Sequence, residues 1–200
     1  MRKERILGVV FCAFWMLCGC ASVKVTRTDV DKKVDLSGNW NDTDSRLVAE
    51  EMIKDCFSRQ WLDRFSRSQN KLPVVIVGTI KNRTSEHIDS QLFTSDLEKN
   101  LINSDKVLFV AAKDSRVELR EERQDQAENA SKSTAKPSRV ETGADFMLQG
   151  SINSIKDEIR GKYVILYQVN LELVNLTTNE KAWIGQKKIK KVVAKSALGL

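Results

Sequence analysis

Apolar and polar side chains alternate along residues 167–173, and this alternation restricts the fold more than any other feature of the chain. Tyr167, Val169, Leu171 and Leu173 are the apolar members, and Gln168, Asn170 and Glu172 lie between them. A period of two places the two sets on opposite faces of a strand, one buried and one exposed to water. Turn-forming residues at 177–180 separate this strand from a second apolar-rich stretch at 182–193. With a further strand expected at 144–155 and a turn at 157–162, the last third predicts an antiparallel meander.

The front half of the chain alternates between helical and extended patterns. Residues 42–45 are capping types, and apolar residues then recur every four positions, which predicts one helix of about 20 residues. A β-branched run at 74–77 follows a proline and is typical of a buried central strand. A second helix is expected at 90–103 and a short strand at 107–111. Together these elements predict an α/β fold, a single α/β sandwich domain with a mixed sheet, a C-terminal antiparallel meander and flanking helices.

Residues 114–130 predict a helix with almost no apolar side chains. Its acidic residues fall on one side and its basic residues on the other, without opposite charges at i, i+3 or i, i+4 spacing. An exposed, partly frayed helix would explain this pattern. So would a helix whose charged stripes meet complementary surfaces on the domain or on a partner. Arg116 and Arg120, from the basic stripe, are therefore candidate partner-binding residues.

The first twenty residues have the pattern of an export signal. Residues 1–5 are mostly basic, residues 6–17 are apolar apart from Gly8, and Leu17-Cys18-Gly19-Cys20 follows. A basic head, a short apolar core and small residues before a cleavage point are typical of a secretory signal peptide. A cysteine directly after that point is the bacterial lipoprotein pattern, so we expect cleavage before Cys20 and lipidation of its thiol. The alternative is an ordinary signal peptide whose apolar core happens to end in cysteine.

This signal divides the chain into a signal peptide at 1–19, a tether at 20–41 and an α/β domain at 42–195. A multiply acylated Cys20 would hold the protein stably, whereas one acyl chain holds a protein only marginally. Ala21 stands where an aspartate often signals inner-membrane retention in enteric bacteria, so we expect an outer-membrane anchor and a mature chain that faces the periplasm. The tether contains no proline, and its twenty residues after Ala21 would span at most about 70 Å when fully extended.

Removal of the signal also changes the composition. Residues 1–19 contain three basic residues and one acidic residue, so the formal charge falls from +6 to +4. Cys12 and Cys18 leave with the signal, Cys20 carries lipid, and Cys56 remains, so no intramolecular disulfide is expected. Cys56 lies on the apolar face of the first expected helix, which favours a buried, inert thiol.

The basic composition suggests a nucleic-acid binder at first sight. Nucleic acid is not an expected ligand in the periplasm, and no aromatic residues interleave with the lysines near the C-terminus as stacking platforms. We therefore expect no nucleic-acid partner. No apolar run reaches the roughly 20 residues of a membrane-spanning helix, which excludes an integral membrane protein.

The sequence lacks the motifs of a catalytic or cofactor site. It has one histidine, His87, in a polar loop expected at 81–89, and it has no phosphate-binding glycine loop, nucleophile elbow or HExxH zinc motif. A lone loop histidine is more often solvated than catalytic, and Cys56 has no second thiol with which to bind a metal. We expect no enzymatic activity, no cofactor and no metal.

Lysines crowd the last expected strand at positions 187, 188, 190 and 191. Alternation places Lys188 and Lys190 on one face with Gln186, and Lys187 and Lys191 on the other. Lysines on a terminal strand commonly protect a sheet edge against unwanted pairing. The alternative is a basic surface for an anionic partner, such as an acidic protein patch or a cell-wall polymer. On that interpretation Lys188 and Lys190 are partner-binding residues.

Several segments resemble the LpoB family of penicillin-binding protein activators. They are residues 37–42 (SGNWND), the strand at 74–78 with its loop at 82–84, residues 143–148 (GADFML) and residues 180–185 (EKAWIG). The resemblance covers about residues 17–193. The fold that it implies is also similar to the N-terminal domain of TolB and to curli-secretion lipoproteins.

The resemblance implies an outer-membrane lipoprotein that docks on a class A penicillin-binding protein, a peptidoglycan synthase, and stimulates it. Activation by binding agrees with the missing catalytic motifs. The enteric activator crosses the peptidoglycan on a long, proline-rich tether, whereas the tether here is short and proline-free. The short tether favours an alternative, a structural or assembly lipoprotein of an outer-membrane or secretion complex.

Overall fold

The computed structural model describes residues 25–30 and 32–194, so Cys20 and the predicted signal peptide lie outside the described residues. The chain divides into two units, Met1–Lys33 and Val34–Leu200. In the described part of the first unit, the Lys32 backbone N–H donates to the carbonyl of Asp29 at 3.2 Å, which closes a turn. The rest of this section concerns the second unit.

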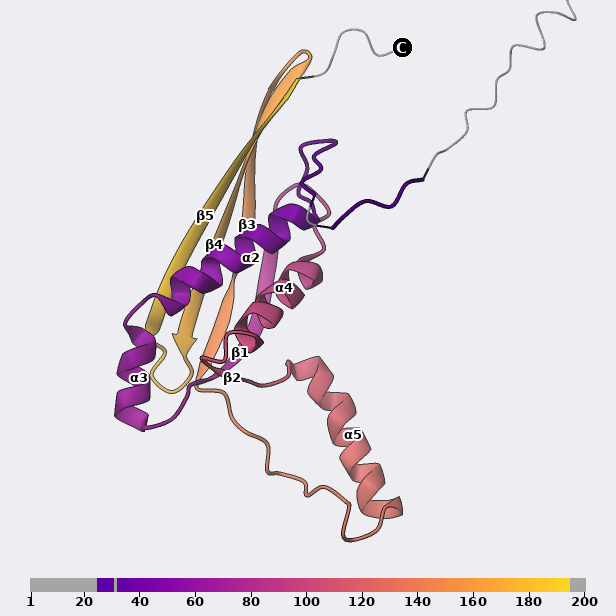
Figure 1. Ribbon diagram of the computed structural model, residues 1–200, viewed down its shortest axis with the longest axis vertical. Coiled ribbons are helices and arrows are strands. Elements are labelled where there is room, and N and C mark those ends of the chain that lie inside the picture. Colours follow the sequence, from indigo (N-terminus) through magenta and orange to yellow (C-terminus); the bar gives the residue numbers. More distant parts are fainter. Residues whose placement is uncertain (1–24, 31, 195–200) are drawn as a thin grey trace, which may run out of the picture. The chain divides into compact units, whose positions relative to one another are not determined.

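A five-stranded mixed sheet forms the centre of this unit (Figure 1). Its strands are β1 (Val74–Arg83), β2 (Leu108–Phe109), β3 (Phe146–Ile159), β4 (Lys162–Asn175) and β5 (Lys181–Ala194), in the order β2-β1-β3-β4-β5. The first strand runs parallel to β2 and β3, and β3, β4 and β5 are antiparallel to one another. The structure therefore confirms the predicted mixed sheet with a C-terminal meander.

The strands run further than the sequence patterns predict. The β3–β4 ladder continues without interruption to the pair Ile159 and Lys162, where a turn at 157–162 was expected. Gly161, at φ +79°, supplies the left-handed conformation that allows such a short connection. β1 likewise continues to Arg83, paired with Asn153 of β3, although a loop was expected from residue 81. Polar side chains at these positions reflect exposure and not the end of the strand.

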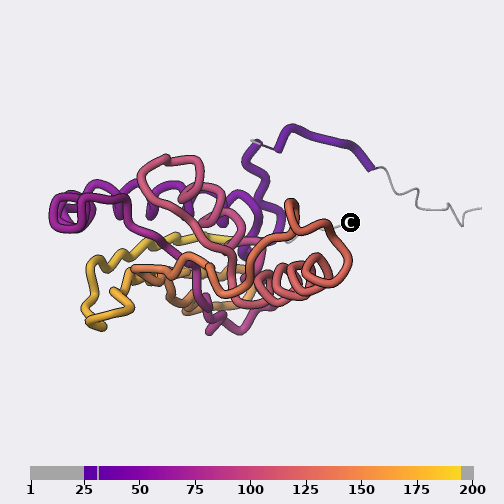
Figure 2. The backbone as a smooth tube through the Cα atoms, turned by 90° about the horizontal axis from the view of Figure 1, so that it is seen from below, coloured from indigo at the N-terminus to yellow at the C-terminus, as the bar shows by residue number. Residues whose placement is uncertain are grey.

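Two helices, α2 (Asp42–Phe57) and α4 (Ser90–Ile102), cover one face of the sheet. The described chain also forms α3 (Trp61–Gln69) and α5 (Lys113–Asn129). Helix α2 contacts β5, α4 contacts β1, and the two helices pack on each other; Figure 2 shows them in a layer on one side of the strands. Side chains from β3, β4 and β5 that point to the other face are partly or fully exposed. The unit is thus a two-layer α/β sandwich, as predicted.

The prediction of a single helix of about 20 residues from residue 42 onwards is wrong. The helix is interrupted at residues 58–60, which separate α2 from α3. Asn41 caps α2 by accepting from the backbone N–H of Asp44 at 3.0 Å. At the other end, the indole N–H of Trp61 donates to the carbonyl of Cys56 at 2.8 Å. The Ser58 hydroxyl donates to the carbonyl of Asp55 at 2.7 Å. In a continuing helix these carbonyls would accept backbone N–H groups, but here they accept from side chains. The helix therefore ends, although apolar residues continue to recur every four positions.

The core lies between α2, α4 and the sheet. The apolar members of the alternating strand, led by Tyr167 and Val169, are at most 1% exposed and meet Ala49, Phe93 and Leu97 of the helices. Cys56 is 1% exposed in the same cluster, and burial raises the pKa of its thiol to about 12. The predicted buried thiol is confirmed.

Residues 34–41, which the sequence patterns place in the tether, are held against the domain. Lys191 Nζ lies 2.6 Å from carboxylate oxygens of both Asp35 and Asp44, and 3.0 Å from the carbonyl of Asn39. Burial opposes the charged amine, but the bonds to the two aspartates outweigh it and raise the pKa of Lys191. Trp40 packs edge-on against Tyr167, with 5.5 Å between the ring centroids. The folded unit therefore begins at Val34.

Replacing Lys191 tests this attachment. The substitution Lys191→Met keeps most of the side-chain volume but leaves two carboxylates without their cation, and the Asp44 side chain is only 9% exposed. We expect the free energy of unfolding to fall by about 2 kcal/mol, measured by urea denaturation of the mature chain.

Lys190→Met is the matched control. Its ammonium is exposed and forms no ion pair within the described residues, so stability should change by less than about 0.5 kcal/mol. Equal stability of the two variants would show that residues 34–41 are not held by Lys191.

Candidate partner-binding surface

The sheet has an open face, which we define as the side of β3, β4, β5 and the end of β1 that points away from α2 and α4. Cross-strand pairs share a face, so the register sorts its side chains into rows. One row contains Lys81, Ser151, Asn170 and Gln186, and the next contains Arg83, Asn153, Gln168 and Lys188.

Amide side chains bond to one another across the middle of the open face. Asn170 Oδ1 accepts from the amide groups of both Gln168 and Gln186 at 3.0 Å. Asn153 donates to the Ser151 hydroxyl at 3.1 Å. These bonds connect the polar side chains of neighbouring strands into one continuous polar surface.

Four cations flank the polar rows of this face, two at each side. Lys188 and Lys190 come from β5, and Lys81 and Arg83 come from the end of β1. All four are exposed, and none forms an ion pair with another residue in the described part of the chain. A hollow of about 430 Å³ on this face is lined in part by Lys81, Arg83 and Glu172, and not by Lys188 or Lys190. Exposed cations without an ion pair suit an anionic partner.

The predicted alternation of the β5 lysines is confirmed. Lys187 points to the helical side and donates to Glu51 at 2.6 Å, and Lys191 holds residues 34–41 as described. Lys188 and Lys190 stand on the open face, across from Gln168 and Leu166. β5 is also an edge strand, so its position fits both interpretations of these lysines, protection of the sheet edge and a basic surface for a partner.

Arg116 and Arg120 do not join these lysines. Arg120 makes two hydrogen bonds of 2.9 and 2.8 Å to Glu141, and Arg123 makes a third of 3.0 Å. These bonds, led by that from Arg120, lower the pKa of Glu141 to about 2. The basic stripe of α5 thus bonds the carboxylate of Glu141, which lies in the segment after the helix. No residue of α5 is buried.

Arg116 lines a separate cavity of about 510 Å³ beside β1, together with Gly78, Thr79 and Met147. Its Nε atom is buried and has no hydrogen-bond partner among the described residues. The strand β4 separates this cavity from Lys188 and Lys190 on β5. The four predicted partner-binding residues therefore occupy three different places.

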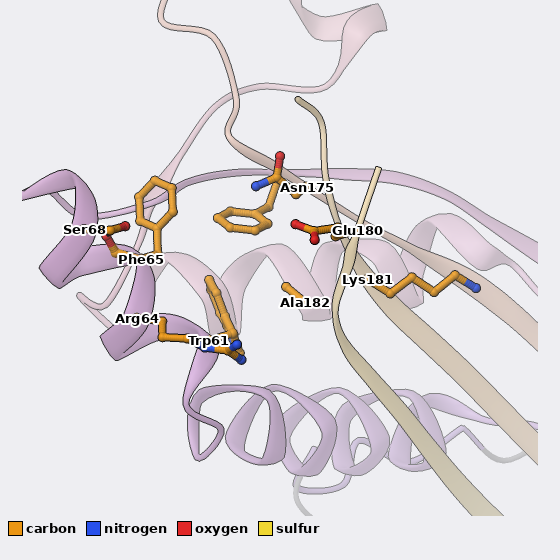
Figure 3. Close-up of a pocket in the computed structure, with 9 residues that line it drawn as sticks. Trp61, Arg64, Phe65, Ser68, Asn175, Glu180, Lys181 and Ala182 are labelled. Atoms are coloured by element: carbon orange, nitrogen blue, oxygen red, sulfur yellow. The ribbon is translucent and has the colours of Figure 1, made fainter. Parts of the chain in front are cut away.

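A further hollow of about 440 Å³ lies between α3 and the β4–β5 turn (Figure 3). Its aromatic wall includes Trp61, Phe65 and Phe146, and the Phe146 ring lies edge-on to both others with centroids 5.2 Å apart. Trp61 and Phe146 belong to the core, so this hollow is mainly the end of the packed interior.

The described residues contain no group of His, Cys, Asp and Glu placed to hold a metal ion. His87 is exposed in the loop after β1. No helix in that part of the chain combines the length and the apolar character needed to cross a membrane.

Comparison with known families assigns the chain. The family model described as "Peptidoglycan-synthase activator LpoB" matches residues 44–189. The chain belongs to the LpoB family. The resemblance found in the sequence is thereby confirmed, and the match extends over most of α2, the strands β1 to β4 and most of β5 of this LpoB-family chain.

Solved structures also match the chain, at low identity. The LpoB C-terminal domain from Escherichia coli is 17% identical, over 66% of this chain and 98% of that one, with a TM-score of 0.37. The corresponding domain from Salmonella enterica is 16% identical, over 64% and 92% of the chains, with a TM-score of 0.34. Lipoprotein GNA1162 from Neisseria meningitidis is 14% identical, over 64% and 89%, with a TM-score of 0.35. The comparison with curated proteins gave no match.

Sequence reasoning missed two of the four cations that flank the polar rows of this LpoB-family chain. Lys81 and Arg83 follow the apolar part of β1, and their polarity favoured a loop. The signal that could have found them is the spacing of Lys81 and Arg83, which is the period of two expected of a strand exposed on one side.

Proposed function

We propose that this LpoB-family chain is an outer-membrane-anchored periplasmic lipoprotein that binds and activates a class A penicillin-binding protein, and so regulates peptidoglycan synthesis. The match of the peptidoglycan-synthase activator family to residues 44–189 carries this proposal. The chain acts by binding and not by catalysis, because neither its motifs nor the described surface offers a nucleophile with its base.

The open face is the proposed docking surface. Lys188 and Lys190, with Lys81 and Arg83 across the sheet, present unpaired positive charge to an acidic surface of the synthase. Charged groups at the rim of an interface raise the association rate and select the partner. Partner binding by Arg116 and Arg120 stays a prediction and is not part of this docking surface. The guanidinium of Arg120 is already bonded to Glu141.

The proposed anchor is lipidated Cys20. Since the folded unit begins at Val34, fourteen residues from 20 to 33 remain as tether, and their full extension is about 50 Å. This reach is shorter than the sequence patterns suggest. The synthase must therefore extend towards the outer membrane to meet the domain.

The short reach is also the observation that favours a second candidate function, a structural or assembly lipoprotein of an outer-membrane or secretion complex. That function predicts stable co-purification with other outer-membrane components and no complex with a synthase. Crosslinking in intact cells followed by identification of the captured protein separates the two.

Addition of the mature chain to a purified class A synthase tests the main proposal. We expect faster glycan polymerisation, and we expect Lys188→Gln with Lys190→Gln to weaken binding by about tenfold, because two unpaired charges leave the docking face. Polymerisation rate and binding affinity are the measurements.

Lys187→Gln is the matched control, because it removes a neighbouring charge from the opposite face of β5 and should bind as the parent chain does. A parent chain that neither binds the synthase nor changes its rate would refute the proposed function. Weakening by the control as strong as that by the pair would refute the assignment of the docking surface.

Substitution of the proposed lipid carrier tests the anchor. Cys20→Ser removes the thiol that accepts the lipid, so we expect the protein to leave the membrane fraction and to accumulate without acyl chains. Membrane fractionation and mass spectrometry of the mature protein measure both effects. A variant that still fractionates with the outer membrane would show that Cys20 is not the anchor.

A further inference from the structure

The far end of the open face changes from polar to apolar. We call this end, residues 155–166 of β3–β4 with Val192 of β5, the ribbon tip. The register places Ile155 beside Leu166, Val164 beside Val192, and Ile159 beside Lys162, all on the same face. Ile155 is 71% exposed, Ile159 is 74% exposed and Val192 is 61% exposed. Exposed aliphatic side chains gathered at one place mark a surface that meets an apolar partner.

Positive charge surrounds the apolar side chains of the ribbon tip. Arg160 lies in the turn, Lys162 follows it, and Lys190 stands across from Leu166. None of these three cations forms an ion pair with another described residue. Asp157 is the one acidic side chain among the cross-strand pairs of β3 and β4 that lie on this face of the ribbon tip. Aliphatic residues bordered by lysine and arginine are the composition of surfaces that lie at a phospholipid interface.

The N-terminal segment meets the folded unit behind the ribbon tip. The Tyr163 hydroxyl donates to the carbonyl of Ser37, and a Cβ on Gly38 would overlap Val193. Tyr163 and Val193 are paired neighbours in β4 and β5, on the side of the strands opposite Val164 and Val192. The chain that leads to Cys20 therefore leaves the unit from this end of the sheet, with fourteen residues and about 50 Å of reach.

We propose that the ribbon tip docks on the phospholipid surface of the membrane that holds the lipid anchor, with Ile155, Ile159 and Val192 in contact with the acyl-chain region. This inference rests on the proposed lipidation of Cys20. Three observations together favour a lipid surface over a protein: the aliphatic patch, its unpaired cations and the short chain that confines this end of the unit near the membrane. Docking of the ribbon tip would leave the polar rows nearer the middle of the sheet free for the synthase.

A fluorophore at the ribbon tip tests the docking. The substitution Ile159→Cys is made in the lipidated full chain, where Cys56 is 1% exposed and will not compete for a thiol-reactive dye. The NBD-labelled chain is reconstituted in vesicles of phosphatidylethanolamine and phosphatidylglycerol whose acyl chains carry bromine. We expect the bromolipids to quench most of the NBD fluorescence at position 159. Thr178→Cys, in the exposed turn at the other end of the sheet, should keep its fluorescence.

A second variant separates docking from the anchor. Ile155→Asp with Val192→Asp should abolish quenching at position 159, because charged side chains do not enter the acyl region. Ile184→Asp is the matched control, since Ile184 is 65% exposed on the same face of β5 but lies beyond the polar rows. Quenching should persist in that control.

The outcomes are distinct. A chain that sediments with vesicles without quenching at position 159 overturns the docking and leaves the anchor standing. A chain that does not sediment with vesicles overturns both. Loss of synthase stimulation in detergent by Ile155→Asp with Val192→Asp would assign the ribbon tip to the synthase and overturn the docking. A dimer in detergent that this pair returns to monomer would assign the tip to a second copy, with the same consequence.

Discussion

Burial of the sheet against helices on one face only is the constraint on which the rest of the structure depends. Tyr167 and the apolar residues that alternate with it fill the space under α2 and α4, so every intervening side chain must lie on the open face. In the middle of the sheet those side chains are polar or charged, as contact with water requires. The same alternation that builds the core therefore also builds the candidate docking surface, which explains why this surface requires no loop or cleft of its own.

The second organising feature is the attachment of residues 34–41 to the back of the meander. Lys191 joins Asp35 to Asp44, and Asp44 also accepts from the backbone N–H of Asn41 in the capping box of α2. One cation thus links the arriving chain, the start of a helix and the edge strand. Because the folded unit begins at Val34, the distance available between the proposed lipid anchor and the domain is shorter than a count of polar residues suggests. That short connection is one of the three observations on which the proposed docking at the ribbon tip rests.

Sequence patterns predicted most elements where a single periodicity was present. The run at 74–77 became the interior strand β1, and Asp89 caps a helix at Ser90–Ile102, close to the expected 90–103. The sequence patterns gave wrong element boundaries where two local signals conflict. The four-residue apolar period continues through 58–60, yet Ser58 and Trp61 capture carbonyls and end the helix. At Lys81 and Arg83, polarity argued for a loop while pairing with β3 kept the strand extended. Local preference is a weak signal when a neighbouring strand supplies the hydrogen bonds.

The sequence by itself determined the fold class, an α/β domain with a meander, and it contains segments typical of the LpoB family. It also predicts a lipoprotein-type N-terminus and contains no recognised catalytic motif. These properties follow from local spacing, which a linear pattern records. Tertiary structure decided which charges remain free. Lys187, Lys188, Lys190 and Lys191 look equivalent in the sequence, but two of them are paired with carboxylates brought from α2 and from residues 34–41. The other two remain exposed because no acidic group of the described chain reaches the open face beside them. Pairing between distant segments is a property of packing, so only the folded unit separates the structural lysines from the candidate binding ones.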